Sequence, residues 1–161
     1  MIKLLQADNF FKDEDVQIMF NATNNLQFVE KEHGLEIENF NMVIPDLDPI
    51  FSKLLAEEVT VDEENSGIFR KPNQNIHFET FTSLSDWVFI VALQFTSFTL
   101  YHHLDGPKTA LDEYRLNYKD FMKWDCHTNI FLQPNEGIIF RPWLFHALDP
   151  GLIQLYKLKG K

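Results

Sequence analysis

The feature that most constrains the fold is a short alternating stretch that begins after a turn and ends at a proline, within residues 137–146. The preceding segment, Gln133–Glu136, contains Pro and Asn, which favour bend conformations. Ile138–Arg141 then shows the period-2 pattern of a β-strand. Pro142 lacks a backbone donor and fixes φ, so the strand must end there or lie on a sheet edge. A single histidine, His146, follows among apolar neighbours.

A second feature is a histidine and a glutamate two positions apart, His77 and Glu79. Side chains at this spacing on a strand share one face, with Cα atoms roughly 7 Å apart, so the two can converge on one point. Together with His146 they would form the two-histidine, one-carboxylate set that binds Fe(II) and leaves coordination positions open. Taken alone, His146 has the alternative of being a packed core histidine. The pattern predicts a metal site formed by His77, Glu79 and His146.

Three segments together resemble a known family: His77-Phe78-Glu79, then Trp87–Leu93, then Pro134–Phe140 leading to His146. They resemble the iron(II)/2-oxoglutarate-dependent oxygenases. The sequence is particularly similar to the small bacteriophage and marine-bacterial branch, which has a short helical part before a double-stranded β-helix. The resemblance covers residues 66–157 and, more loosely, the N-terminal part. It implies Fe(II) and 2-oxoglutarate as cofactors and the three residues above as metal ligands.

Two positions depart from the pattern of this family. Its motif is usually His-x-Asp, for which Glu79 is a less common substitute. Its last strand normally starts with an Arg that pairs with the far carboxylate of 2-oxoglutarate, whereas Gly151–Lys157 contains no Arg. Arg70, Arg141 and Lys157 are the candidates to replace it, and a planar guanidinium can bind a carboxylate bidentately. For Arg141 the alternative is a solvated side chain on the outer face of its strand.

Composition indicates one folded domain, residues 1–161. The chain is 45% hydrophobic and 14% aromatic, which is typical of globular proteins. The single cysteine excludes an intrachain disulfide and a thiolate zinc cluster. A net charge of −10 argues against general nucleic-acid binding. Neither a membrane-spanning apolar run nor a signal peptide is visible, so a cytoplasmic protein without a membrane partner is expected, and a homodimer is left open.

The N-terminal part, residues 1–65, is predicted to be helical. Apolar spacing predicts one helix over residues 12–23 and a second over residues 50–58. Residues 26–40 are predicted to be irregular or a weak hairpin. Residues 62–67, with the sequence Asp-Glu-Glu-Asn-Ser-Gly, are predicted to form a solvated acidic loop.

The C-terminal part, residues 66–161, is predicted to form the β-helix core. It is rich in Val, Ile, Phe and Thr, with a bend at Gln94–Thr96 and a possible helix at Leu111–Lys123. The fold class predicted is α+β, a double-stranded β-helix (jelly roll, cupin-like) with short N-terminal helices packed on one sheet.

Two other groups of residues can be considered for chemistry. His102 and His103 are adjacent, so on a strand at most one of them can face a pocket. Cys126 and His127 are also adjacent, but a nucleophile and its base need spatial rather than sequential proximity.

Two functions therefore remain open. The first is an Fe(II)/2-oxoglutarate-dependent dioxygenase of the hydroxylase type, acting on a small-molecule or peptide substrate. The second is a non-catalytic, cupin-like binding or structural protein that has lost the cosubstrate site. The ligand spacing favours the first and the missing Arg favours the second, and analogy of fold cannot decide between them.

Overall fold

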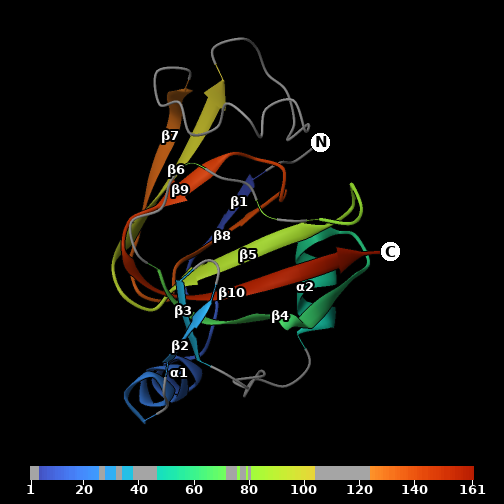
Figure 1. Ribbon diagram of the computed structural model, residues 1–161. Coiled ribbons are helices and arrows are strands. Elements are labelled where there is room, and N and C mark those ends of the chain that lie inside the picture. Colours follow the sequence, from blue (N-terminus) through green and yellow to red (C-terminus); the bar gives the residue numbers. More distant parts are fainter. Residues whose placement is uncertain are drawn as a thin grey trace.

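The computed structural model describes residues 4–25, 28–31, 34–37, 47–71, 76, 79, 81–103 and 124–161. In this part of the chain two antiparallel sheets and two helices form a layered α+β structure (Figure 1). The large sheet contains, in spatial order, β1 (Leu4–Ala7), β8 (Gly137–Phe140), β5 (Trp87–Ala92), β10 (Gly151–Gly160), β4 (Val59–Lys71), β3 (Gly34–Ile37) and β2 (Phe28–Lys31). The small sheet contains β7 (Trp124–Leu132), β6 (Thr96–His103) and β9 (His146–Leu148).

The two helices, α1 (Asp13–Asn25) and α2 (Asp48–Leu55), lie close to the predicted positions. Three acids in the first turn of α1 complement the positive end of its dipole. In α2, Pro49 stands in the first turn, where its missing N–H costs no hydrogen bond. Ala56 ends α2 in the left-handed conformation, with φ of 53°. None of the helices in the described residues is long and apolar enough to cross a bilayer.

Two hydrophobic cores lie on opposite faces of the large sheet. On β10, Leu152 and Tyr156 belong to the core that α1 and α2 share with the sheet. Ile153 and Leu155 belong to the core between the two sheets. This alternation follows from the period of two in a strand. Lys157 is two residues beyond Leu155 and therefore lies on the same face of β10, which points toward the small sheet.

The helix-side core is built around aromatic rings. Phe89 is fully buried, and its ring centroid lies 4.5 Å from that of Phe10, 5.3 Å from that of Phe51 and 6.0 Å from that of Tyr156. Burial, and secondarily the charge of Asp15, raise the pKa of the Tyr156 hydroxyl above its ordinary value. Edge-to-face and stacked ring pairs of this kind add to the free energy of area burial.

The structure confirms the α+β fold, the two helices and the bend at Gln94–Thr96, which separates β5 from β6. The prediction of an acidic loop at residues 62–67 is wrong, because these residues lie inside β4. Strand β10 pairs with β4 at both ends of this segment. The register between the two strands shifts once, between Leu155 and Lys157 of β10. Glu63 and Glu64 are exposed, so the strand accommodates their charges without burying them.

The N-terminal part is less purely helical than predicted. It contributes β1 to one edge of the large sheet, and β2 and β3 to the other edge. Residues 26–40 were predicted to be irregular or a weak hairpin, and the hairpin is confirmed, with Phe28 opposite Ile37. The possible helix at Leu111–Lys123 lies outside the described residues.

We expect limited proteolysis to find no stable fragment that lacks residues 1–60. Removing them would strip both edges of the large sheet and take Phe11, Met19 and Phe51 out of the helix-side core. The measurement is brief trypsin treatment followed by size-exclusion chromatography and mass spectrometry. A compact fragment that begins near residue 66 and keeps its circular-dichroism spectrum would contradict a single-domain organisation.

Candidate metal centre

A five-residue loop, Arg141–Phe145, connects the two sheets next to the candidate ligands. Strand β8 ends at Phe140, two residues before Pro142, as the proline predicted. A turn follows, in which the Leu144 N–H donates to the Arg141 carbonyl at 3.1 Å. Strand β9 of the small sheet then begins with His146. The loop thus delivers His146 to the wall of the inter-sheet space.

His146 is fully buried, with an exposed fraction of 0%. Its ring stacks on Phe98 at 5.3 Å between centroids and meets Phe140 edge-on at 4.7 Å. Its Nδ1 lies 2.9 Å from the carbonyl oxygen of Leu144. A carbonyl oxygen can only accept, so Nδ1 carries the hydrogen, and in the neutral ring Nε2 presents a lone pair. This is the tautomer in which a histidine binds a metal through Nε2.

Glu79 reaches the same point from a distant part of the chain. Its backbone N–H donates to the carbonyl of Pro142 at 2.9 Å. Nearby, the rings of Phe81 and Trp143 meet edge-to-face with centroids 5.6 Å apart. These contacts join the Glu79 segment to the Arg141–Phe145 loop. The Glu79 Oε1 atom lies 3.6 Å from Nε2 of His146, and the Glu79 side chain is buried.

The chemistry of these two side chains fits a shared cation. When the Glu79 carboxylate is ionised and the His146 ring is neutral, the two facing atoms are both acceptors, and neither can donate a hydrogen bond to the other. Two donors that each lie about 2.1 Å from a metal at a right angle are about 3.0 Å apart, a spacing close to the one observed. Glu79 and His146 can therefore bind one divalent ion after a small adjustment.

The third predicted ligand, His77, lies outside the described residues. Within the described residues, no group of three or more His, Cys, Asp or Glu side chains could hold a metal ion. The prediction placed His77 and Glu79 on one strand. The two described residues of that stretch, Ile76 and Glu79, do not belong to a strand. The three-ligand site therefore stays a prediction, of which the structure brings two members together.

Lys157 lies beside the candidate ligands. Its side chain projects from β10 on the face that points toward the small sheet, and its Nζ lies 3.5 Å from Oε2 of Glu79. The side chain has an exposed fraction of 19%. Lys157, one of the three candidates for binding the cosubstrate carboxylate, therefore lies next to the candidate ligand Glu79.

Arg141 is buried elsewhere. Its guanidinium pairs with the carboxylate of Glu57, with Nη2 3.0 Å from Oε1, and covers the ring of Trp87 at 3.6 Å. The expected alternative for Arg141, a solvated side chain, is wrong, because only 3% of the residue is exposed. Arg70 lies in β4 opposite Leu152, and its side chain is outside the described part of the structure.

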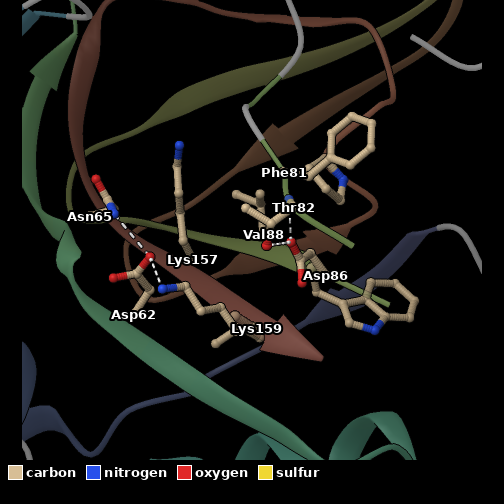
Figure 2. Close-up of a pocket in the computed structure, with 11 residues that line it drawn as sticks. Asp62, Asn65, Phe81, Thr82, Asp86, Val88, Lys157 and Lys159 are labelled. Atoms are coloured by element: carbon tan, nitrogen blue, oxygen red, sulfur yellow. Dashed lines mark hydrogen bonds and ion pairs between the residues drawn. The ribbon is translucent and has the colours of Figure 1, made fainter. Parts of the chain in front are cut away.

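Lys157 is also one of the residues that line a pocket of about 190 Å³ (Figure 2). One wall is charged: Asp62 accepts a hydrogen bond from Asn65 at 2.9 Å and pairs with Lys159 at 3.1 Å. Burial raises the pKa of Asp62, but the Asn65 hydrogen bond and Lys159 outweigh it, so the net pKa is lowered. Phe81, Thr82, Val88 and Pro142 also line the pocket, among other residues.

The other candidates for chemistry have no described role at this centre. Cys126 and His127 are exposed on β7. The side chains of His102 and His103, near the end of β6, lie outside the described part.

Sequence reasoning missed the groups that orient the ligands. The carbonyl groups of Pro142 and Leu144 belong to the backbone, so no pattern of side chains in the sequence indicates their contacts. Glu57, the partner of Arg141, is 84 positions away and carries no local signal. Pro142 is the only one of these residues that the sequence singled out, and it did so as the end of a strand.

No protein-family model matches this sequence, and no curated protein matches it either. Solved structures do match its fold. HygX from Streptomyces hygroscopicus, with nickel and 2-oxoglutarate bound, is 12% identical, with a TM-score of 0.61 over 99% of this chain and 83% of that chain. AviO1 from Streptomyces viridochromogenes Tue57 is 7% identical, with a TM-score of 0.67 over 99% of this chain and 90% of that chain.

A third similar structure is SnoN, a non-haem α-ketoglutarate-dependent epimerase from nogalamycin biosynthesis. It is 8% identical, with a TM-score of 0.65 over 98% of this chain and 78% of that chain. Likeness at these identities concerns the fold. These matches confirm the predicted fold, a double-stranded β-helix.

Proposed function

We propose that the chain is a non-haem Fe(II)/2-oxoglutarate-dependent oxygenase of the hydroxylase type, acting on a small molecule or a peptide. One observation carries the proposal: Nε2 of His146 and the carboxylate of Glu79 face each other at 3.6 Å. The Leu144 carbonyl holds the imidazole in its metal-binding tautomer. Two similar folds support it, since HygX holds nickel and 2-oxoglutarate and SnoN is α-ketoglutarate-dependent.

Fe(II) at this site would supply the oxygen chemistry, and the protein would supply binding and orientation. Glu79 and His146 hold the ion together with His77, the ligand that the sequence predicts. Phe98 and Phe140 pack around His146 and keep water away from its ring. The pocket that Lys157 lines gives a ligand of the metal room to extend along β10.

Lys157 is proposed to bind the distal carboxylate of 2-oxoglutarate. Its ammonium lies near Glu79 already, so a divalent ion on Glu79 would repel it toward an anionic ligand. Lys157 also lies on β10, the last strand, at whose start the family carries its Arg. The guanidinium of Arg141 is held by Glu57, which makes it the weaker candidate.

The test of the function is turnover of the cosubstrate. The chain is purified without oxygen, loaded with Fe(II) and mixed with 2-oxoglutarate in air, and succinate is measured over time. We expect slow succinate formation without any added substrate, and none when the iron is removed by a chelator. Tight metal binding without succinate formation would favour the second function, a non-catalytic binding protein.

Replacing Lys157 by Met is expected to raise the KM for 2-oxoglutarate roughly 10- to 150-fold. Hydrogen bonds to charged groups are worth about 1.5–3 kcal/mol, and each 1.36 kcal/mol is about a tenfold change. Metal affinity should stay within about threefold, because Lys157 would not be a ligand. The measurement is succinate formation against 2-oxoglutarate concentration.

The matched control for this prediction is Lys159→Met. Lys159 lies two residues along β10 and pairs with Asp62 rather than Glu79. Its loss should leave the KM for 2-oxoglutarate unchanged. Equal effects of the two substitutions would show that general positive charge, and not an anchor at Lys157, attracts the cosubstrate.

A further inference from the structure

Both described candidate ligands are oriented by backbone carbonyls of one loop, Arg141–Phe145. The Pro142 carbonyl accepts the backbone N–H of Glu79 at 2.9 Å. The Leu144 carbonyl accepts the Nδ1 hydrogen of His146 at 2.9 Å. The position of each ligand therefore depends on the conformation of this loop. A shift of the loop would displace Glu79 and rotate the His146 ring.

The side chain of Arg141 anchors the loop on the other side of the large sheet. Its Nη2 donates to both carboxylate oxygens of Glu57, at 3.0 and 3.3 Å, and its Nη1 donates to the Asp86 carbonyl at 3.2 Å. Trp87 donates from its indole Nε1 to the same Glu57 carboxylate at 2.9 Å, and its ring lies 3.6 Å from the Arg141 guanidinium. The anchor thus joins the loop to the α2–β4 connection and to the start of β5.

The anchor does not contact the described ligands. Trp87, which the guanidinium covers, belongs to the helix-side core. Phe140, which contacts His146, belongs to the inter-sheet core. Arg141 and His146 are therefore supported from opposite faces of the large sheet. Arg141 is the buried member of this ion pair, so the loss of Glu57 leaves a buried guanidinium without its charged partner and the loop would be expected to rearrange.

We propose that Arg141 and Glu57 are positioning residues, which hold the Arg141–Phe145 loop so that its carbonyls orient Glu79 and His146 for metal binding. The inference rests on the proposed function, because it assumes that Glu79 and His146 bind a metal ion. It adds two residues, Arg141 and Glu57, that act on the metal site through the loop. Releasing the anchor lowers the fraction of molecules in the binding-competent conformation, and the apparent dissociation constant rises in inverse proportion. Loss of groups that orient metal ligands typically weakens metal affinity about 10- to 100-fold.

The variants that test this are Glu57→Gln, Arg141→Lys and Arg141→Met. The Glu57 side chain is 40% exposed, so Glu57→Gln should fold even where Arg141→Met does not. Lys keeps the charge but lacks the planar fork and stacks poorly on Trp87, so Arg141→Lys should lie between wild type and Arg141→Met. The matched control is Ser52→Ala. It removes two hydrogen bonds between Ser52 and Val59, which loosens the α2–β4 connection without touching Arg141.

Two readouts are measured on each purified protein. The first is the tautomer of His146 in the metal-free state, from the ¹⁵N shifts of Nδ1 and Nε2. The second is the affinity for Ni(II) by calorimetry. We expect wild type and Ser52→Ala to hold the hydrogen on Nδ1 and to bind Ni(II) equally. In Glu57→Gln and both Arg141 variants we expect mixed tautomers and Ni(II) binding about 10- to 100-fold weaker.

The readouts separate this inference from the proposed function. If the anchor variants only lose thermal stability, and keep the wild-type tautomer and Ni(II) affinity, the positioning role is refuted. If wild type binds no Ni(II) but the variants still lose the Nδ1 tautomer, the anchor orients His146 and the proposed metal function fails. Ser52→Ala behaving like the anchor variants would also refute the inference, since any loosening of that connection would then suffice.

Discussion

Replacing His146 by alanine is expected to abolish both metal binding and succinate formation. The substitution removes one of three proposed ligands, and a labile ferrous ion cannot be held by the remaining two at micromolar concentrations. We expect Fe(II) affinity to fall at least ~100-fold, the upper end of the range for groups that merely orient ligands. The measurement is anaerobic calorimetry with Fe(II), followed by the succinate assay on the same sample.

The matched control is His127→Ala, which removes an exposed imidazole from β7. It should leave Fe(II) affinity and turnover unchanged. His146→Ala also leaves a cavity between Phe98 and Phe140, so thermal unfolding must show that the variant is folded. A folded His146→Ala protein that binds Fe(II) as tightly as wild type would disprove the metal centre.

Replacing Phe89 by alanine is expected to lower the free energy of unfolding by about 3–5 kcal/mol. The ring is fully buried and meets three other aromatic rings in the helix-side core, so its loss leaves a cavity that α2 and the sheet cannot fill. At about 2–4 °C per kcal/mol for a domain of this size, the midpoint of thermal unfolding should fall by ~6–20 °C. Urea titration and differential scanning calorimetry measure the two quantities.

An exposed ring gives the matched control for Phe89. Phe131 is 61% exposed and stacks only on Phe95 among the described rings, so Phe131→Ala should cost about 0.5–1.5 kcal/mol. A second control uses Gly137, where an added β-carbon would overlap the Phe89 ring. Gly137→Ala should therefore be less destabilising in the Phe89→Ala background, with the remaining cost set by the Ile90 carbonyl oxygen, which the added carbon would meet at 2.9 Å. Equal effects of Phe89→Ala and Phe131→Ala would mean that the helix-side core is not packed as described.

Patterns that depend on neighbours in sequence could be interpreted correctly from the sequence. The alternation at Ile138–Arg141 and the proline after it predicted β8 and its end. Apolar spacing and first-turn acids predicted α1. The motif spacing also selected Glu79 and His146, which are 67 positions apart and lie 3.6 Å from each other, while their role as metal ligands stays a prediction. Each of these depends on the period of a single element or on a motif already associated with a function.

Features that depend on partners far along the chain were predicted wrongly or not at all. Residues 62–67 have the composition of a loop, and they lie inside a strand because β10 pairs with β4 at both ends of the segment, through Asp62 and Gly67. Arg141 was considered for binding a carboxylate, and it does bind one, but the carboxylate belongs to Glu57. Neither outcome has a local signal, because each decisive contact joins residues that are dozens of positions apart in the chain.

The position of β1 at the edge of the large sheet has a consequence for the order in which the chain can fold. Leu4 pairs with Phe140 and Ala7 with Gly137, so these partners are separated by 136 and 130 positions (140 − 4 and 137 − 7). During synthesis β1 emerges early and must stay unpaired until β8 has been made. Such contacts between distant residues slow folding, and they leave strand edges open to other chains meanwhile. Closure of the β1–β8 edge is therefore expected to be a late step of assembly, and until it occurs β1 and the edge of β8 are open to aggregation.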